Sequence, residues 1–141
     1  MIKAVAKESP AICFFLGDGL RDIAALSDKY PDLPVYSVRG NCDFRSDVSN
    51  AIICNVGGVS IFATHGHLYS VKYETEFSTL AEHAKDAGAD IALFGHTHWQ
   101  HLSEKNGVML LNPGSAGRGS CCYAVIEING GQYSAYLKHI S

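Results

Sequence analysis

The sequence predicts an α/β fold, because short apolar segments alternate with a helical pattern and polar residues follow each apolar segment. Residues 11–16 are a continuous apolar run that ends at Gly17, as expected of a strand buried on both faces. Residues 20–26 have the i, i+3, i+6 apolar spacing of a helix, and residues 34–38 form the next short strand. We expect these segments to make a strand, a helix and a second strand.

Turn residues place the remaining elements. Gly57-Gly58 is expected to join two strands in a β-hairpin, and Gly88 to lie just past the end of a helix. Pro10 limits the first helical segment, because proline disfavours helix at the residue before it. The other predicted elements are the end of a helix at residues 2–6, strands at 51–56, 59–63 and 90–94, a helix at 75–87, and strands at 99–103, 108–111, 121–128 and 132–140.

The composition predicts one globular domain over residues 1–141. Hydrophobic residues make up 47% of the chain and charged residues 18%, which argues against disorder. Five irregularly spaced cysteines include no Cys-x-x-Cys pair, so we expect reduced thiols in a cytoplasmic protein. No apolar run is long enough for a membrane span, and scattered basic residues with a net charge of -3 predict no nucleic-acid-binding surface.

Side chains that can bind metal follow four of the predicted strands. These side chains are Asp18, Asn41, His65 with His67, and His96 with His98. Ligands of open α/β sheets bind at the carboxyl ends of strands, so the four positions can converge. Carboxylate, amide and imidazole groups suit borderline divalent cations such as Mn²⁺, Fe²⁺, Zn²⁺ and Ni²⁺. The alternative is that these positions are ordinary turns, which Gly, Asp and Asn favour for backbone reasons; their repetition after four strands favours a site.

The segment from Leu93 to His98 is the expected centre of that site. Gly95 is expected to end its strand through a backbone turn that residues with side chains resist. His96 and His98 flank Thr97, so in extended backbone they would point the same way. They would then bind two neighbouring cations, or one cation from two directions.

Four motifs occur in a fixed order along the chain. They are Gly17-Asp18, Gly40-Asn41-Cys42-Asp43, Thr64-His65-Gly66-His67 and Gly95-His96-Thr97-His98, with Asn112-Pro113-Gly114-Ser115 after them. Together they resemble the motifs of the calcineurin-like metallophosphoesterases, specifically the small bacterial and archaeal phosphodiesterase branch. The resemblance implies a four-layer αββα sandwich and hydrolysis of phosphodiesters or phosphomonoesters by a metal-bound hydroxide. Mn²⁺ is the expected metal, with Ni²⁺, Zn²⁺ and Fe²⁺ as alternatives.

The resemblance also assigns metal ligands. By motif, Asp18 would bridge two metal ions, and Asn41, His65 and His96 would complete one of the two sites. His98 would belong to the other site. Two cations about 3.5–4 Å apart activate a bridging water and hold both the attacking and the departing oxygen of a phosphoryl transfer.

Four residues are expected to face the substrate phosphate, the first three of them in catalytic roles: Asn41, Cys42, His67 and Arg118. Many relatives have His at the position of Cys42, and a thiol is a weaker hydrogen-bond donor, so we expect weaker help to the leaving group and a preference for activated esters. A small buried filler is the alternative for Cys42. Asp43 is expected to orient ligands rather than bind metal.

The chain departs from the family pattern at its start. Family members resemble one another in opening with a strand that ends in Asp-x-His, and residues 1–17 contain neither Asp nor His. The first strand is therefore expected to be missing, leaving one complete metal site, an unpaired edge along residues 11–16, and possible homo-oligomers through that edge. The function expected is a phosphoesterase impaired by its incomplete first site; the alternative is a non-catalytic protein-binding scaffold.

Overall fold

The structure, a computed structural model of the whole chain, describes all residues except 19–20, 42, 44–47, 117–120 and 141. Its elements in chain order are α1 (Ile2–Glu8), β1 (Cys13–Phe15), α2 (Arg21–Lys29), β2 (Val35–Ser37), β3 (Ala51–Val56), β4 (Val59–Thr64), α3 (Ser78–Asp86), β5 (Ile91–Leu93), β6 (Gln100–Lys105), β7 (Val108–Pro113), β8 (Cys121–Asn129) and β9 (Gln132–Ile140). The predicted strands and helices all occur, with small differences at their ends.

A five-stranded sheet in the order β3-β4-β5-β7-β6 forms the centre of the fold. Its inner strands are apolar on both faces, and in β5 all three residues are buried. One face packs against α3, where Leu80 and Ala84 of the helix share a core with Phe62 and Leu110 of the sheet. Gly88 ends this helix as expected, with a left-handed backbone at φ +77°.

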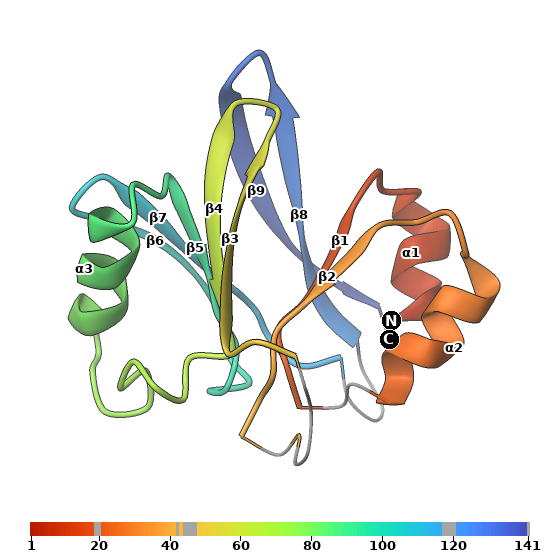
Figure 1. Cartoon of the computed structure of the whole chain (residues 1–141), viewed down its shortest axis with the longest axis horizontal. Helices are drawn as coiled ribbons and strands as arrows, with labels where there is room; N and C mark the ends of the chain where they lie inside the picture. The colour runs from red at the N-terminus through yellow and green to blue at the C-terminus, as the bar shows by residue number, and fades with distance from the viewer. Residues whose placement is uncertain (19–20, 42, 44–47, 117–120, 141) are drawn as a thin grey trace.

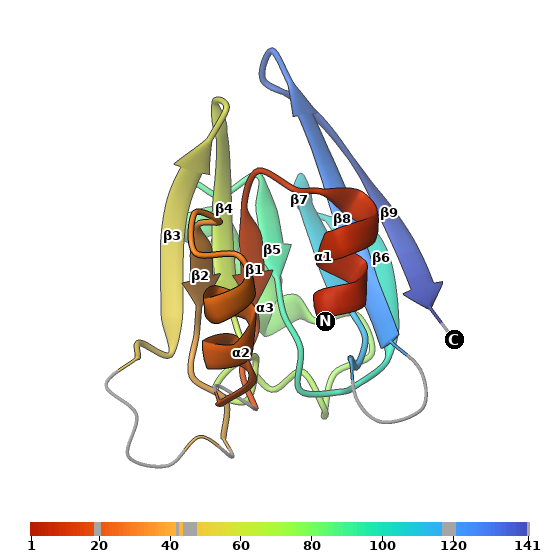
Figure 2. The ribbon, with the colours of Figure 1, turned by 90° about the vertical axis from the view of Figure 1, so that its right-hand side faces the viewer.

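The opposite face of the central sheet packs against two pairs of strands. The pair β1-β2 is parallel and the pair β8-β9 is antiparallel. Phe14 of the first pair, Val38 directly after β2 and Ile126 of the second pair lie in the same apolar core as Ile61 and Leu93 of the central sheet. Helices α1 and α2 lie outside these strands, on the side away from α3 (Figures 1 and 2). The layers confirm the αββα sandwich.

The strand β1 is less buried than the sequence predicts. Its three residues are all half-buried, whereas an apolar run of this kind was expected to be covered on both faces. The reason lies in its pairing: within the described part of the chain, β1 is hydrogen-bonded to β2 alone. The Cys13 N–H donates to Pro34, and the Phe15 carbonyl accepts from Val38. In a parallel ladder the N–H and C=O of Phe14 then face the opposite edge.

The three helices are short, with seven, nine and nine residues. Among the described residues no helix is long and apolar enough to cross a membrane. The carboxylate of Glu8 at the end of α1 accepts hydrogen bonds from Tyr123 and Lys138. These contacts attach α1 to the β8-β9 pair and lower the pKa of Glu8, with the Tyr123 hydrogen bond as the largest cause.

Strand direction brings the metal-binding motifs together. The strands β4 and β5 are parallel neighbours in which Ala63 lies opposite Leu93, so both strands end at the same edge of the sheet. The parallel strands β1 and β2 belong to the neighbouring layer, and they end at its matching edge, in the lower part of Figure 1. Four loops that are distant in the sequence therefore meet there.

Candidate metal centre

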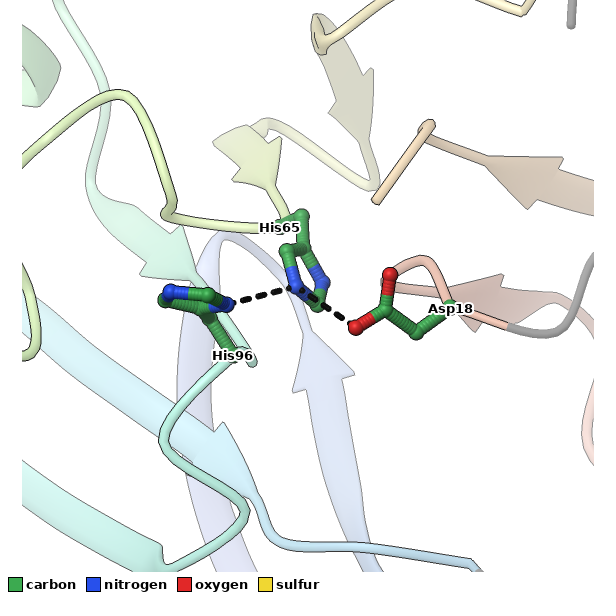
Figure 3. A group of neighbouring side chains, drawn as sticks. All are labelled: Asp18, His65 and His96. Atoms are coloured by element: carbon green, nitrogen blue, oxygen red, sulfur yellow. Dashed lines mark hydrogen bonds and ion pairs between the residues drawn. The ribbon is translucent and has the colours of Figure 1, made fainter. Parts of the chain in front are cut away.

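Four predicted ligands meet at one imidazole nitrogen. The Nε2 atom of His65 lies 3.1 Å from a carboxylate oxygen of Asp18, 3.0 Å from the amide oxygen of Asn41 and 3.0 Å from Nδ1 of His96. The ligand atoms of Asp18, His65 and His96 all lie within 4.8 Å of one another, and Figure 3 shows the three side chains turned towards a common point. Each residue follows a different strand.

The backbone decides which nitrogen of His65 faces this point. Nδ1 of His65 lies 2.7 Å from the carbonyl oxygen of Leu16, and a carbonyl can only accept, so Nδ1 carries a proton. In a neutral ring Nε2 then holds a lone pair and faces the oxygens of Asp18 and Asn41, which also hold lone pairs, as well as Nδ1 of His96. One proton cannot satisfy all these contacts, whereas a divalent cation at their centre can. The donor set therefore fits a metal ion.

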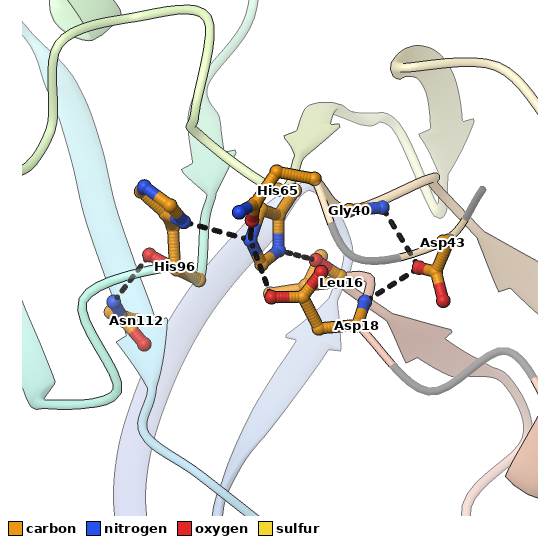
Figure 4. Close-up of polar contacts among 9 residues, drawn as sticks. Leu16, Asp18, Gly40, Asp43, His65, His96 and Asn112 are labelled. Carbon is orange, nitrogen blue, oxygen red and sulfur yellow. Dashed lines mark hydrogen bonds and ion pairs between the residues drawn. The ribbon is translucent and has the colours of Figure 1, made fainter.

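Two glycines allow the loop that carries Asp18 and the loop that carries Asn41 to approach each other closely. A Cβ on Gly40 would collide with the backbone and carboxylate of Asp18, and a Cβ on Gly17 would collide with the backbone of Gly40. The carboxylate of Asp43 joins the same two loops, because it accepts hydrogen bonds from the N–H groups of Asp18 at 2.6 Å and Gly40 at 2.9 Å (Figure 4). Asp43 thus holds the backbone of the candidate ligand Asp18, and its expected role in orienting a ligand stays a prediction.

The loop that carries His96 is not extended, which corrects the expectation from the sequence. His96 and His98 have left-handed backbones with φ of +67° and +65°, whereas Gly95 does not have a positive φ. Residues with a Cβ resist this conformation, so the surrounding structure must hold it in place. The buried side chain of Asn112 does so, because its amide donates to the carbonyl of Gly95 at 3.1 Å and to the hydroxyl of Thr97 at 3.0 Å.

The electrostatic environment keeps two of the imidazoles neutral. Burial, followed by the positive charge of Lys72, lowers the pKa of His96 from 6.5 to about 4. Burial is also the main cause that lowers the pKa of His67, with smaller effects from His65 and Arg39. At neutral pH the His96 ring is therefore uncharged and keeps the one nitrogen lone pair with which it can bind a cation.

The other predicted site residues differ in position. The ring of His67 lies 5.5 Å from that of His65 and 6.2 Å from that of His96, and its buried Nδ1 has no hydrogen-bond partner among the described residues. His98 is exposed and is not among the three clustered acidic and imidazole ligands. Cys42 and Arg118 lie outside the described residues, so their roles stay predictions.

The sequence did not reveal the positioning role of Asn112. It also did not reveal that the basic side chains of Arg39 and Lys72 act on the imidazoles. Asn112 is fully buried, and a polar residue between an apolar strand and Pro113-Gly114 was the available signal. Arg39 immediately precedes Gly40 and its Nε donates to Asn50 at 3.2 Å. Lys72 lies in a polar loop and has no signal of its own in the sequence.

An αββα sandwich with carboxylate, amide and imidazole ligands at the carboxyl ends of its strands defines a class of metal-binding α/β proteins. Residues 2–131 match the family model of the calcineurin-like phosphoesterase superfamily domain. The chain belongs to this family, which confirms the resemblance seen in its motifs.

Known proteins resemble the chain in sequence and fold. The probable metallophosphoesterase YsnB of Bacillus subtilis (strain 168) is 35% identical over 91 residues, which are 64% of this chain; the chain spans about half of YsnB, 53%. A crystal structure of a predicted phosphoesterase from Streptococcus pneumoniae TIGR4 is 24% identical, with a TM-score of 0.74 over 97% of this chain and 88% of that one. Vps29 from Entamoeba histolytica, crystallised with Zn²⁺, is 21% identical, with a TM-score of 0.67 over 92% of this chain and 81% of its own.

Proposed function

We propose that the protein hydrolyses phosphoesters at a divalent metal ion held by Asp18, Asn41, His65 and His96. The observation that carries the proposal is the position of His65, whose Nε2 atom faces two oxygen acceptors and a second imidazole nitrogen within 3.1 Å. Mn²⁺ is the metal we propose, because the mixed oxygen and nitrogen donors suit borderline divalent ions. Membership of the phosphoesterase family supports a phosphoryl group as the reacting centre.

The side chains around the cluster have distinct proposed roles. A cation bound there supplies Lewis acidity, which lowers the pKa of water and polarises a phosphoryl oxygen. The carbonyl of Leu16 holds His65 in the tautomer that binds metal. The unpartnered Nδ1 of His67 is proposed to contact a phosphate oxygen, and Asn41 to orient the same group. Cys42 and Arg118 are proposed on the substrate side from their motif positions.

The proposal is tested with bis(para-nitrophenyl) phosphate, an activated phosphodiester. EDTA-treated protein should be inactive, and added Mn²⁺ should restore turnover in proportion to the metal bound. Metal analysis after dialysis should find a tightly held ion, because the described residues form a cluster with a full set of donors. Bound Mn²⁺, Zn²⁺ or Ni²⁺ without turnover of this diester or of para-nitrophenyl phosphate would contradict the enzymatic function.

A second candidate function is protein binding through the open edge of β1. We propose that this edge pairs with a second copy of the chain, since the Phe14 N–H and C=O face away from β2 and exposed strand edges recruit other strands. Tyr36 of β2, which stacks against Phe14 at 5.4 Å, is 41% exposed.

Light scattering should therefore detect a dimer that forms as the protein concentration rises. Phe14→Pro should weaken this dimer, because proline removes an N–H that faces the open edge and leaves the ladder to β2 intact. Phe14→Leu is the matched control, since it shortens the same side chain and keeps the N–H. A monomer at every concentration, or equal association of both variants, would show that the edge does not pair.

A further inference from the structure

A cleft of about 440 Å³ with a mixed polar and apolar lining lies next to the loop that carries His96. Its lining includes the apolar side chains of Val71 and Phe77 together with Lys72, Thr97 and Trp99. Thr97 directly follows the ligand His96, so the loop that holds the metal ligand also forms a wall of the cleft. The volume lies within the range of small-molecule sites.

Trp99 is an exposed aromatic residue in the wall of this cleft. Its side chain is 79% exposed, and its backbone N–H donates to the hydroxyl of Thr97 at 3.3 Å. This hydrogen bond links Trp99 to the His96 loop, which Asn112 also holds. An exposed indole beside a metal centre offers a flat surface for stacking, and such surfaces are frequent at binding sites.

Lys72 adds a positive charge to the lining of the cleft. Lys72 lines the cleft together with Thr97, the residue that follows His96, so its ammonium group can serve a phosphate bound at that side of the cleft. Within the described residues Lys72 forms no ion pair. The nearby carboxylate of Glu74 is engaged elsewhere, because it accepts hydrogen bonds from the N–H and hydroxyl of Thr79 at 2.9 and 2.6 Å.

We infer that the substrate is a phosphoester carrying a flat aromatic group, of which a nucleotide is the natural type. Trp99 stacks on this aromatic group, and Lys72 contacts the phosphate. The inference rests on the proposed function for the position of the phosphate. It adds the direction in which the rest of the substrate extends, which is from the metal ligands past Thr97 and into the cleft. Val71 and Phe77 add apolar side chains to the lining of the cleft, beside the indole on which the ring would stack.

Fluorescence tests the stacking directly, because Trp99 is the single tryptophan of the chain. Adenosine monophosphate should quench the emission saturably, and ribose phosphate, which lacks the ring, should not. The titrations are run in EDTA and again in Mg²⁺, so that binding is measured whether or not turnover occurs. Quenching without hydrolysis would support the inference and contradict the proposed function. Equal effects of the two phosphates, with hydrolysis intact, would overturn the inference alone.

Substitutions distinguish the proposed roles of Trp99 and Lys72. Trp99→Ala should raise KM for an aryl phosphodiester about tenfold while changing kcat little, since stacking of a ring on an aromatic side chain is typically of that size. Trp99→Phe should restore most of the affinity. Lys72→Ala should weaken binding of adenosine monophosphate and of ribose phosphate alike, because both carry the phosphate, whereas Lys3→Ala on the exposed face of α1 should change neither. An unchanged KM in Trp99→Ala would refute the role of the indole.

Discussion

Replacing His96 with Gly is expected to abolish tight divalent metal binding and, at the same time, to stabilise the metal-free fold. His96 supplies one of the donors around Nε2 of His65, and no other described imidazole lies as close to that atom. Its left-handed backbone, with φ of +67°, is strained for any residue with a Cβ. Glycine removes this strain, which costs about 1–2 kcal/mol in the left-handed region.

Three measurements test this result. Metal content after dialysis in Mn²⁺ should fall to background, hydrolysis should be lost with it, and urea unfolding in EDTA should give a higher free energy of unfolding than wild type. His96→Ala should lose the metal without gaining stability, because alanine keeps the strained Cβ. His139→Ala, on the exposed face of β9, is the control and should retain metal and activity. If the His96 variants kept their metal, the ligand assignment would be wrong.

Gly40→Ala is expected to disrupt the metal centre through steric collision. A Cβ at this position would lie closer to the backbone nitrogen and carboxylate of Asp18 than nonbonded atoms can approach. The loop would have to move, and with it the hydrogen bonds that Asp43 accepts from Gly40 and Asp18. Loss of such orienting contacts typically lowers metal affinity about 10–100-fold, so we expect a decrease of at least this size.

Gly88→Ala separates a defect of the site from a general loss of stability. Gly88 has φ of +77° with no atom near its Cβ position, so alanine there is strained and should cost about 1–2 kcal/mol without touching the metal centre. Calorimetric titration with Mn²⁺ should show normal affinity in Gly88→Ala and weak binding in Gly40→Ala. Similar metal affinities for the two variants would show that the approach of the two loops is not needed for the site.

Local sequence patterns predicted most of the fold. The hairpin of β3 and β4 occurs at residues 51–56 and 59–64 around Gly57-Gly58, because its turn and its apolar strands are encoded by neighbouring residues. Helix α3 begins at Ser78, three residues later than predicted. Glu74, which precedes the helix, accepts hydrogen bonds from the N–H and the hydroxyl of Thr79 in its first turn. The burial of β1 was overestimated, because burial depends on which strand pairs with its far edge and not on its own composition.

The sequence by itself determined the order of the strands and helices and the candidate metal ligands that follow four of them, because hydrophobic period and turn residues are local properties of a chain. It also indicated that Asp43 orients a ligand. Only the tertiary structure decided that Asp18, Asn41 and His96 meet at one nitrogen of His65. It also decided that the carbonyl of Leu16 holds the proton of that ring on Nδ1. The hydrogen bond from Asn112 that holds the strained His96 loop is likewise a tertiary contact. These contacts join residues far apart in the chain, and strand direction and register, which the packing of the whole sheet sets, bring them within bonding distance.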